Sequence, residues 1–218
     1  YPTCRNMHPA IDLSLALGRE HDIHPDEIKE ILVKTYHIAI KESGNIWEPQ
    51  DATEAKFSMP YAVAVALIKR SAGLKEFSEP TVSDRNVLRL AGKVRIERDE
   101  KLEKNYPAVR GAEVTVTLKN GSSYAKREDL PKGEPENPLT DEELKEKFFC
   151  CVEEIFDAGR APLDIDNISA KSDTQGNYLT GRAEEIIKIV ENLEEIKDVN
   201  TLISMLDSSK HPTRVDGS

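Results

Sequence analysis

The chain has 218 residues, of which 32% are charged, and its formal net charge is −10. This acidic balance argues against nucleic-acid binding, which requires a basic surface. No apolar run approaches the roughly 20 residues of a membrane-spanning helix, so we expect no membrane insertion. Cys4, Cys150 and Cys151 form neither a disulfide framework nor a C-x-x-C pair, which favours a reducing, cytoplasmic compartment. The length suffices for one large or two small domains with a real core.

The first twelve residues, Tyr1 to Asp12, bring a thiol, a guanidinium, an imidazole and a carboxylate together. No helix or strand period explains this mixture. The chain also starts inside this stretch, without an initiator Met and without a signal peptide pattern. We therefore expect the sequence to be a piece of a larger protein.

Hydrophobic patterning predicts helices and strands in mixed order up to about residue 138. The expected elements are a helix from Pro9 to Leu17 that stops at Gly18, a strand from Ile31 to Ile40 with His37 on one face, a buried helix from Pro60 to Gly73, a short helix from Val82 to Leu90 capped by Ser83 or Asp84, and a strand from Val94 to Arg98.

The clearest local prediction is a β-hairpin with strands at Val114–Leu118 and Ser123–Lys126. Val114, Val116 and Leu118 alternate with polar residues, so one face should be buried. Asn120-Gly121 predicts a two-residue type I′ turn, in which both central residues have positive φ.

The proline-rich segment from Pro131 to Pro138 is the best candidate for a domain boundary. It predicts an α+β domain over residues 1–138 and a helical segment over 139–207, followed by a disordered tail at 208–218. The helical segment should contain a helix after the Thr140–Glu143 capping box, a long loop from Asp157 to Tyr178, a helix around Ile186–Leu193 and a last helix capped by Asp198. The order of elements favours the α+β class.

Two clusters of polar residues are candidates for chemistry. In the first, Arg5 has the planar fork that best holds a carboxylate, His8 can exchange a proton near neutral pH, and Cys4 lies beside them. The alternative is that Arg5 and His8 only begin a helix at the surface and that Cys4 fills space. Spacing alone leaves both interpretations open.

In the second cluster, Lys56, Ser58 and Tyr61 stand at the start of an apolar helix, where Lys and Tyr could bind or protonate an anion. The alternative is a half-buried aromatic ring and a lysine whose stem lies on apolar surface. His21 and His24 lack a third ligand at metal-binding spacing, and His37 reads as a structural histidine. No Walker, Rossmann or G-x-S-x-G motif is present.

Several blocks of this sequence, in order, resemble the second domain of the MmgE/PrpD family. They are Tyr-Pro-Thr-Cys-Arg-Asn-Met-His-Pro-Ala-Ile-Asp at residue 1, Ala-Lys-Phe-Ser-Met-Pro-Tyr-Ala-Val-Ala-Val-Ala-Leu at residue 55, Glu-Val-Thr-Val-Thr-Leu-Lys-Asn-Gly at residue 113, and Pro-Lys-Gly-Glu-Pro-Glu-Asn-Pro-Leu-Thr-Asp-Glu-Glu-Leu at residue 131. The resemblance implies a small α+β lid domain followed by helices that return to an all-helical N-terminal domain, which is absent from this chain. It also implies a homodimer for the full-length protein.

The family resemblance further implies lyase or isomerase chemistry on a small di- or tricarboxylate, with no obligatory cofactor or metal. A base would remove a proton α to a carboxylate, as in a 2-methylcitrate dehydratase-like reaction. Arg5 would then bind a substrate carboxylate together with Cys4 and Ser58, and His8, Lys56 and Tyr61 would act as catalytic groups.

The sequence also departs from this pattern in one place. In the decarboxylase branch of the family a histidine falls near the position of Cys4, so dehydratase or epimerase chemistry is favoured here. Since half of the cleft is missing, we expect the isolated chain to be inactive. The competing hypothesis is a non-catalytic binding or assembly module that keeps the lid fold.

Overall fold

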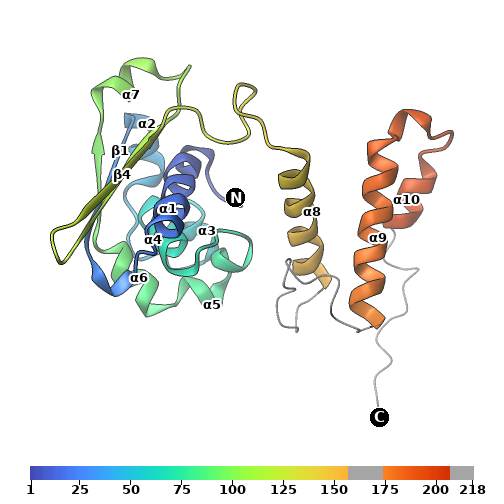
Figure 1. Cartoon of the computed structure of the whole chain (residues 1–218), viewed down its shortest axis with the longest axis horizontal. Helices are drawn as coiled ribbons and strands as arrows, with labels where there is room; N and C mark the ends of the chain where they lie inside the picture. Colours follow the sequence, from blue (N-terminus) through green and yellow to red (C-terminus); the bar gives the residue numbers. More distant parts are fainter. Residues whose placement is uncertain (157–173, 207–218) are drawn as a thin grey trace, which may run out of the picture. The chain divides into compact units, whose positions relative to one another are not determined.

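The computed structural model describes residues 1–156 and 174–206. It divides into two compact units, Tyr1–Thr140 and Asp141–Ser218 (Figure 1). The first unit combines a four-stranded mixed sheet with helices, and the second is helical where it is described. The predicted α+β class is therefore confirmed. None of the helices in the described part of the chain is long and apolar enough to cross a membrane.

The sheet of the first unit has the order β2-β1-β3-β4. β1 (Ile28–Thr35) pairs in parallel with β2 (Val94–Arg98) and antiparallel with β3 (Ala112–Leu118), which pairs antiparallel with β4 (Ser123–Glu128). Alternate residues are buried along β3 and along β1 from Ile31 onward, because successive strand residues point to opposite faces.

Helices cover the buried face of the sheet (Figure 1). α1 (His8–Glu20) packs against β3, β4 and α4 (Met59–Lys69), and α4 packs in turn against α6 (Arg85–Ala91). Every residue of α4 from Met59 to Leu67 is buried, as expected of a helix that is apolar on all sides. Full burial of one such Val or Leu side chain contributes about 1.5–3 kcal/mol, so this helix anchors the core.

Shorter elements complete the first unit. They are α2 (His37–Ser43), α3 (Ala52–Ala55), α5 (Glu79–Val82), α7 (Glu100–Asn105) and the 3-10 turns η1 (Arg5–Met7), η2 (Pro25–Glu27) and η3 (Lys75–Phe77).

The predicted helix stop at Gly18 is wrong, because α1 continues to Glu20. Gly18 instead leaves space for the Arg70 guanidinium: a Cβ at Gly18 would lie 1.9 Å from Arg70 Nη1. Arg70 itself has φ 56° and ends α4 at Lys69, ahead of the predicted end at Gly73. Its Nη2 donates a hydrogen bond to the Ile23 carbonyl at 2.5 Å, so Gly18 serves packing between two helices.

The second half of the predicted strand Ile31–Ile40 is also wrong. β1 ends at Thr35, and α2 begins at His37 after an extended Tyr36. Tertiary contacts override the β-branched pattern here: the His37 amide donates to the Glu103 carboxylate at 2.6 Å, and the Tyr36 hydroxyl donates to Asn6 at 2.7 Å. His37 therefore starts a helix and does not lie on a strand face.

The predicted helix Val82–Leu90 corresponds to α6, which begins later, at Arg85, while Val82 is the last residue of the separate helix α5. Asp84, one of the two predicted caps, accepts a hydrogen bond from the Asn86 amide at 2.9 Å and so caps α6. The predicted strand Val94–Arg98 is confirmed as β2.

The predicted hairpin is confirmed in its strands and corrected in its turn. Gly121 has φ 91° and Asn120 does not have a positive φ, so the turn is not type I′. The Gly121 amide donates to the Leu118 carbonyl at 3.0 Å, and the Leu118 amide donates to the Ser122 carbonyl at 2.8 Å. This pattern is a three-residue loop in which the glycine takes the left-handed position.

The second unit contains α8 (Asp141–Phe156), α9 (Thr174–Glu191), the 3-10 turn η5 (Leu193–Glu195) and α10 (Asn200–Leu206). The predicted cap of the last helix is confirmed, since Asp198 accepts from the Asn200 amide at 2.9 Å. The predicted loop Asp157–Tyr178 is wrong at its end, because residues 174–178 belong to α9; residues 157–173 and the predicted tail 208–218 lie outside the described residues.

Candidate functional site

The turn η1 joins the first residues directly to α1 and places Arg5 one helical turn before His8. The Cys4 amide donates a hydrogen bond to the Lys56 carbonyl at 2.9 Å, which fixes the entering chain beside the start of α4. Arg5 Nη1 lies 2.9 Å from His8 Nδ1. The spacing of three residues, which the sequence analysis singled out, therefore produces a direct contact between the two side chains.

The Arg5 guanidinium is held by the loop that follows β4. Its Nη1 donates to the Lys132 carbonyl at 3.0 Å, and its Nη2 donates to Glu134 Oε1 at 3.0 Å. Gly133, with φ 90°, turns the loop between these two contacts, and its amide donates to the Asn137 carbonyl at 2.8 Å. An arginine fork that already binds a carboxylate shows the geometry by which it could bind another.

The protonation state of His8 follows from its neighbour. Arginine can only donate hydrogen bonds, so Nδ1 of His8 must accept from Arg5 and carry a lone pair. The imidazole in this arrangement is therefore neutral, with its proton on Nε2, which faces the Thr3 carbonyl at 3.4 Å. The Tyr1 ring packs edge-on against the imidazole at 5.2 Å between centroids and orients it.

Asp12 lies one turn further along α1 and joins this cluster through Tyr1. The Tyr1 hydroxyl donates to Asp12 Oδ1 at 2.5 Å, while Oδ2 is buried without a hydrogen-bond partner. Burial raises the pKa of the Asp12 carboxyl, an effect that the bond from Tyr1 and the nearby Lys132 amide partly offset. We call Tyr1, Arg5, His8, Asp12 and Glu134 the N-terminal cluster.

Lys56 and Cys4 border the N-terminal cluster through their backbones. The Lys56 side chain is half-buried, and its ammonium makes no hydrogen bond or ion pair within the described residues 1–156 and 174–206. Cys4 is a half-buried free thiol that packs against the core. The Lys56 ammonium and the Cys4 thiol therefore lie on residues whose backbones adjoin the cluster.

The polar groups of Ser58 and Tyr61 serve the scaffold. The buried Ser58 hydroxyl donates to the Ile46 carbonyl at 2.5 Å and accepts from the Tyr61 amide at 3.1 Å, which caps α4. Tyr61 is buried, its hydroxyl donates to the Glu76 carbonyl at 2.6 Å, and burial raises the pKa of its phenol. Both hydroxyls thus hold backbone carbonyls within the first unit.

His21 and His37 serve different structural roles. His21 stacks on Tyr124 with 4.0 Å between ring centroids, and His37 begins α2. Within the part of the chain that the structure describes, no three His, Cys, Asp or Glu side chains are grouped so that they could hold a metal ion.

Sequence reasoning missed Glu134, Lys132 and the pairing of Tyr1 with Asp12. The segment Pro131–Pro138 was interpreted as a connector because of its prolines, although it folds back onto Arg5. The only sequence signal was Gly133 beside an acidic residue, which indicates a tight turn but not the partner of that turn.

The sequence of the chain matches a known protein family over most of its length. Residues 1–161 match the MmgE/PrpD C-terminal domain, so the chain belongs to the MmgE/PrpD family and contributes that domain.

Two relatives are cis-aconitate decarboxylases. The human protein is 27% identical over 166 residues, which cover 75% of this chain and 29% of the relative. The mouse protein is 23% identical over 158 residues, which cover 72% of this chain and 28% of the relative. The chain therefore spans less than a third of the length of these relatives.

Proposed function

We propose that this chain is the C-terminal, lid-forming part of an enzyme that acts on a small di- or tricarboxylate. The observation that carries the proposal is the Arg5 fork, which holds the Glu134 carboxylate at 3.0 Å and touches His8 at 2.9 Å. A substrate carboxylate would replace Glu134 on Nη2 and come to lie next to a neutral imidazole. Membership of the MmgE/PrpD family supports this reading.

In the proposed reaction, a base removes a proton α to a carboxylate while Arg5 fixes the neighbouring carboxylate. Positioning of the substrate and stabilisation of the developing negative charge would supply most of the rate. A neutral His8 that carries its proton on Nε2 can donate that proton as a general acid, and the ammonium of Lys56 is available to stabilise an anion. Ser58 and Tyr61 we assign to the scaffold, because their hydroxyls hold backbone carbonyls.

Water loss or epimerisation is the preferred outcome of this chemistry, because Cys4 stands where the decarboxylase branch has a histidine. Decarboxylation is the second candidate, since both relatives named above are cis-aconitate decarboxylases. We propose that catalysis needs a further domain, a homodimer and no metal or organic cofactor. On this proposal the isolated 218 residues turn over no polycarboxylate.

The test uses the protein in which this chain is joined to the sequence preceding it. Arg5→Ala should lower kcat/KM for 2-methylcitrate or cis-aconitate by about 100-fold or more, the loss of one charge-assisted clamp, with the fold intact by circular dichroism. Arg85→Ala is the matched control, because the Arg85 side chain is exposed and makes no hydrogen bond or ion pair with the described residues. Product analysis by NMR separates loss of water, epimerisation and release of CO2.

Two results would contradict the proposal. An Arg5→Ala variant with unchanged kcat/KM would remove Arg5 from the site. Absence of turnover with every polycarboxylate, in a protein that carries the helical domain, would favour the binding or assembly module instead.

A further inference from the structure

A second polar site lies in the first unit, where three basic side chains line a cavity of about 400 Å³. The cavity is lined by Pro25, Asp26, Ile68, Asn86, Arg89, Leu90, Lys93 and Lys119. All of these residues belong to the first unit, and none of them belongs to the N-terminal cluster. We call this the basic pocket.

The strand topology explains why the basic residues meet. β1 and β2 run parallel, so they start at the same edge of the sheet, and the antiparallel β3 ends there. Lys93 immediately precedes β2 and Lys119 immediately follows β3. The Lys119 amide donates to the Glu27 carbonyl at 2.8 Å, which ties the end of β3 to the turn before β1.

The cations of the basic pocket outnumber its acids. Arg89, Lys93 and Lys119 carry three positive charges, and Asp26 carries the one negative charge. Asp26 binds Arg89 Nη2 at 3.0 Å, but both side chains of this pair are mostly exposed, at 88% and 65%, so the pair is weak. The excess of two charges stands out in a chain whose net charge is −10.

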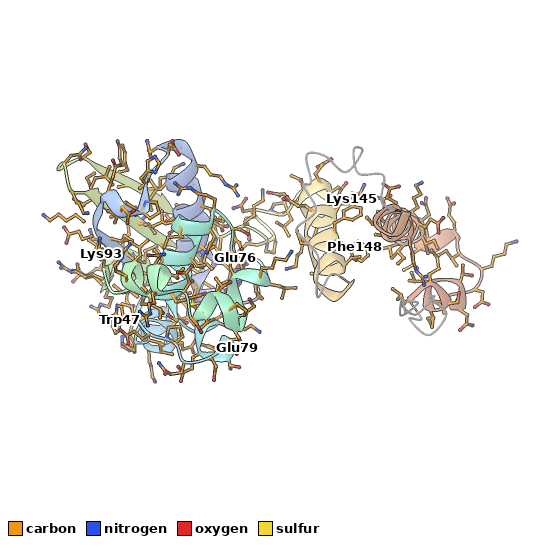
Figure 2. All side chains as sticks on the ribbon, turned by 90° about the horizontal axis from the view of Figure 1, so that it is seen from below. Trp47, Glu76, Glu79, Lys93, Lys145 and Phe148 are labelled. Atoms are coloured by element: carbon orange, nitrogen blue, oxygen red, sulfur yellow. The ribbon has the colours of Figure 1, made fainter. Side chains whose placement is uncertain are left out.

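Lys93 is the most deeply placed of the three cations. Its Nζ donates to the Ile28 carbonyl at 2.5 Å, and its side chain is half-buried, near the outer surface of the first unit (Figure 2). Burial lowers the pKa of Lys93, and the charges of Lys119 and Arg89 lower it further. An anion in the basic pocket would relieve this repulsion.

The wall of the basic pocket adds a second requirement for its ligand. Ile68 of α4 and Leu90 of α6 give it an apolar side, while the Asn86 amide is a neutral polar group. The volume falls in the range of small-molecule sites. A ligand that fits carries about two negative charges at one end and an apolar body at the other, which describes a phosphate monoester.

We propose that the basic pocket binds a small phosphate monoester with an apolar body, independently of the polycarboxylate site. Lys93 and Lys119 contact the phosphate as point charges, Arg89 exchanges part of its bond to Asp26 for the ligand, and Ile68 and Leu90 pack against the apolar body. The proposal does not depend on the proposed function, because it uses none of its residues.

The experiment is an NMR titration of the whole 218-residue chain with phenyl phosphate as the probe. Saturable shifts of the Asn86, Lys93 and Lys119 amides are expected. Lys119→Gln and Arg89→Gln should each weaken binding roughly fivefold, the upper value for an exposed ion pair. Lys101→Gln is the matched control, because Lys101 is exposed on α7, and it should leave binding unchanged.

Three companion outcomes decide against the proposal. Benzoate that binds as tightly as phenyl phosphate would overturn the assignment of a dianion. Inorganic phosphate that binds as tightly would remove the role of Ile68 and Leu90. Shifts that do not saturate, or that Lys101→Gln weakens as much as Lys119→Gln, would show general charge attraction and overturn the site.

Discussion

Glu134→Gln is the sharpest perturbation of the N-terminal cluster, because Glu134 occupies the very fork that we propose for the substrate. If a ligand carboxylate must displace Glu134 from Arg5 Nη2, then Glu134 is an internal competitor. Removing its charge should tighten the binding of a polycarboxylate, whereas removal of an ordinary structural acid should weaken binding or leave it unchanged.

The size of the effect follows from the exposure of the pair. The side chains of Arg5 and Glu134 are 33% and 27% exposed, so water screens the interaction and its contribution is about 1 kcal/mol rather than the larger value of a buried pair. Losing a competitor of that strength tightens binding about fivefold. The folded state should lose a similar amount of stability.

The assay is a calorimetric titration of the 218-residue chain with propane-1,2,3-tricarboxylate at low and high salt. Glu136→Gln is the matched control, since Glu136 lies in the same loop, is exposed and carries the same charge. The gain should appear with Glu134→Gln alone and shrink at high salt. Equal affinity of Glu134→Gln and the wild type, or an equal gain with Glu136→Gln, would refute the competition.

Two further substitutions separate chemistry from scaffold. Asp12 has a raised pKa, so the stability it confers is fully present below its unfolded pKa near 3.8 and is lost as pH rises through the folded value. Asp12→Asn should remove this decline in stability. Urea unfolding midpoints measured from about pH 4 to 7 that fall in parallel for the wild type and the variant would contradict the prediction. Tyr61→Phe leaves the Glu76 carbonyl without its donor, so it should lower the free energy of urea unfolding by about 1–3 kcal/mol and leave tricarboxylate affinity unchanged. A loss of affinity with unchanged stability would instead show that Tyr61 belongs to the binding site.

The parts of the fold that were predictable depend on local patterns. The strands of the hairpin follow from alternating Val114, Val116 and Leu118, and α1 follows from its apolar period and Pro9. The turn at Gly121 and the end of β1 at Thr35 were mispredicted, because a three-residue loop forms at the first and the distant acceptor Glu103 decides the second. Such contacts leave no periodic trace in the sequence.

The candidate site likewise contains some residues that local sequence patterns could indicate and others that they could not. Arg5 and His8 could be selected because they are three residues apart and carry distinctive chemistry. Glu134 could not, because 129 residues separate it from Arg5 and its segment has the composition of a linker. Ser58 and Tyr61 looked functional in sequence because a polar residue before an apolar helix serves equally as an N-cap or as a ligand, and only the bonds to Ile46 and Glu76 distinguish the two.

The hydrogen-bond roles in the N-terminal cluster constrain the chemistry of His8 more than its spacing does. Because Arg5 donates to Nδ1 at 2.9 Å, the only lone pair of the neutral imidazole is occupied. The imidazole therefore presents only its Nε2 proton and can donate it, and a substrate that replaces Glu134 leaves the contact between Arg5 and Nδ1 intact. If His8 donates a proton, Arg5 therefore acts twice, by holding a carboxylate with one nitrogen and by setting the tautomer of the proton donor with the other.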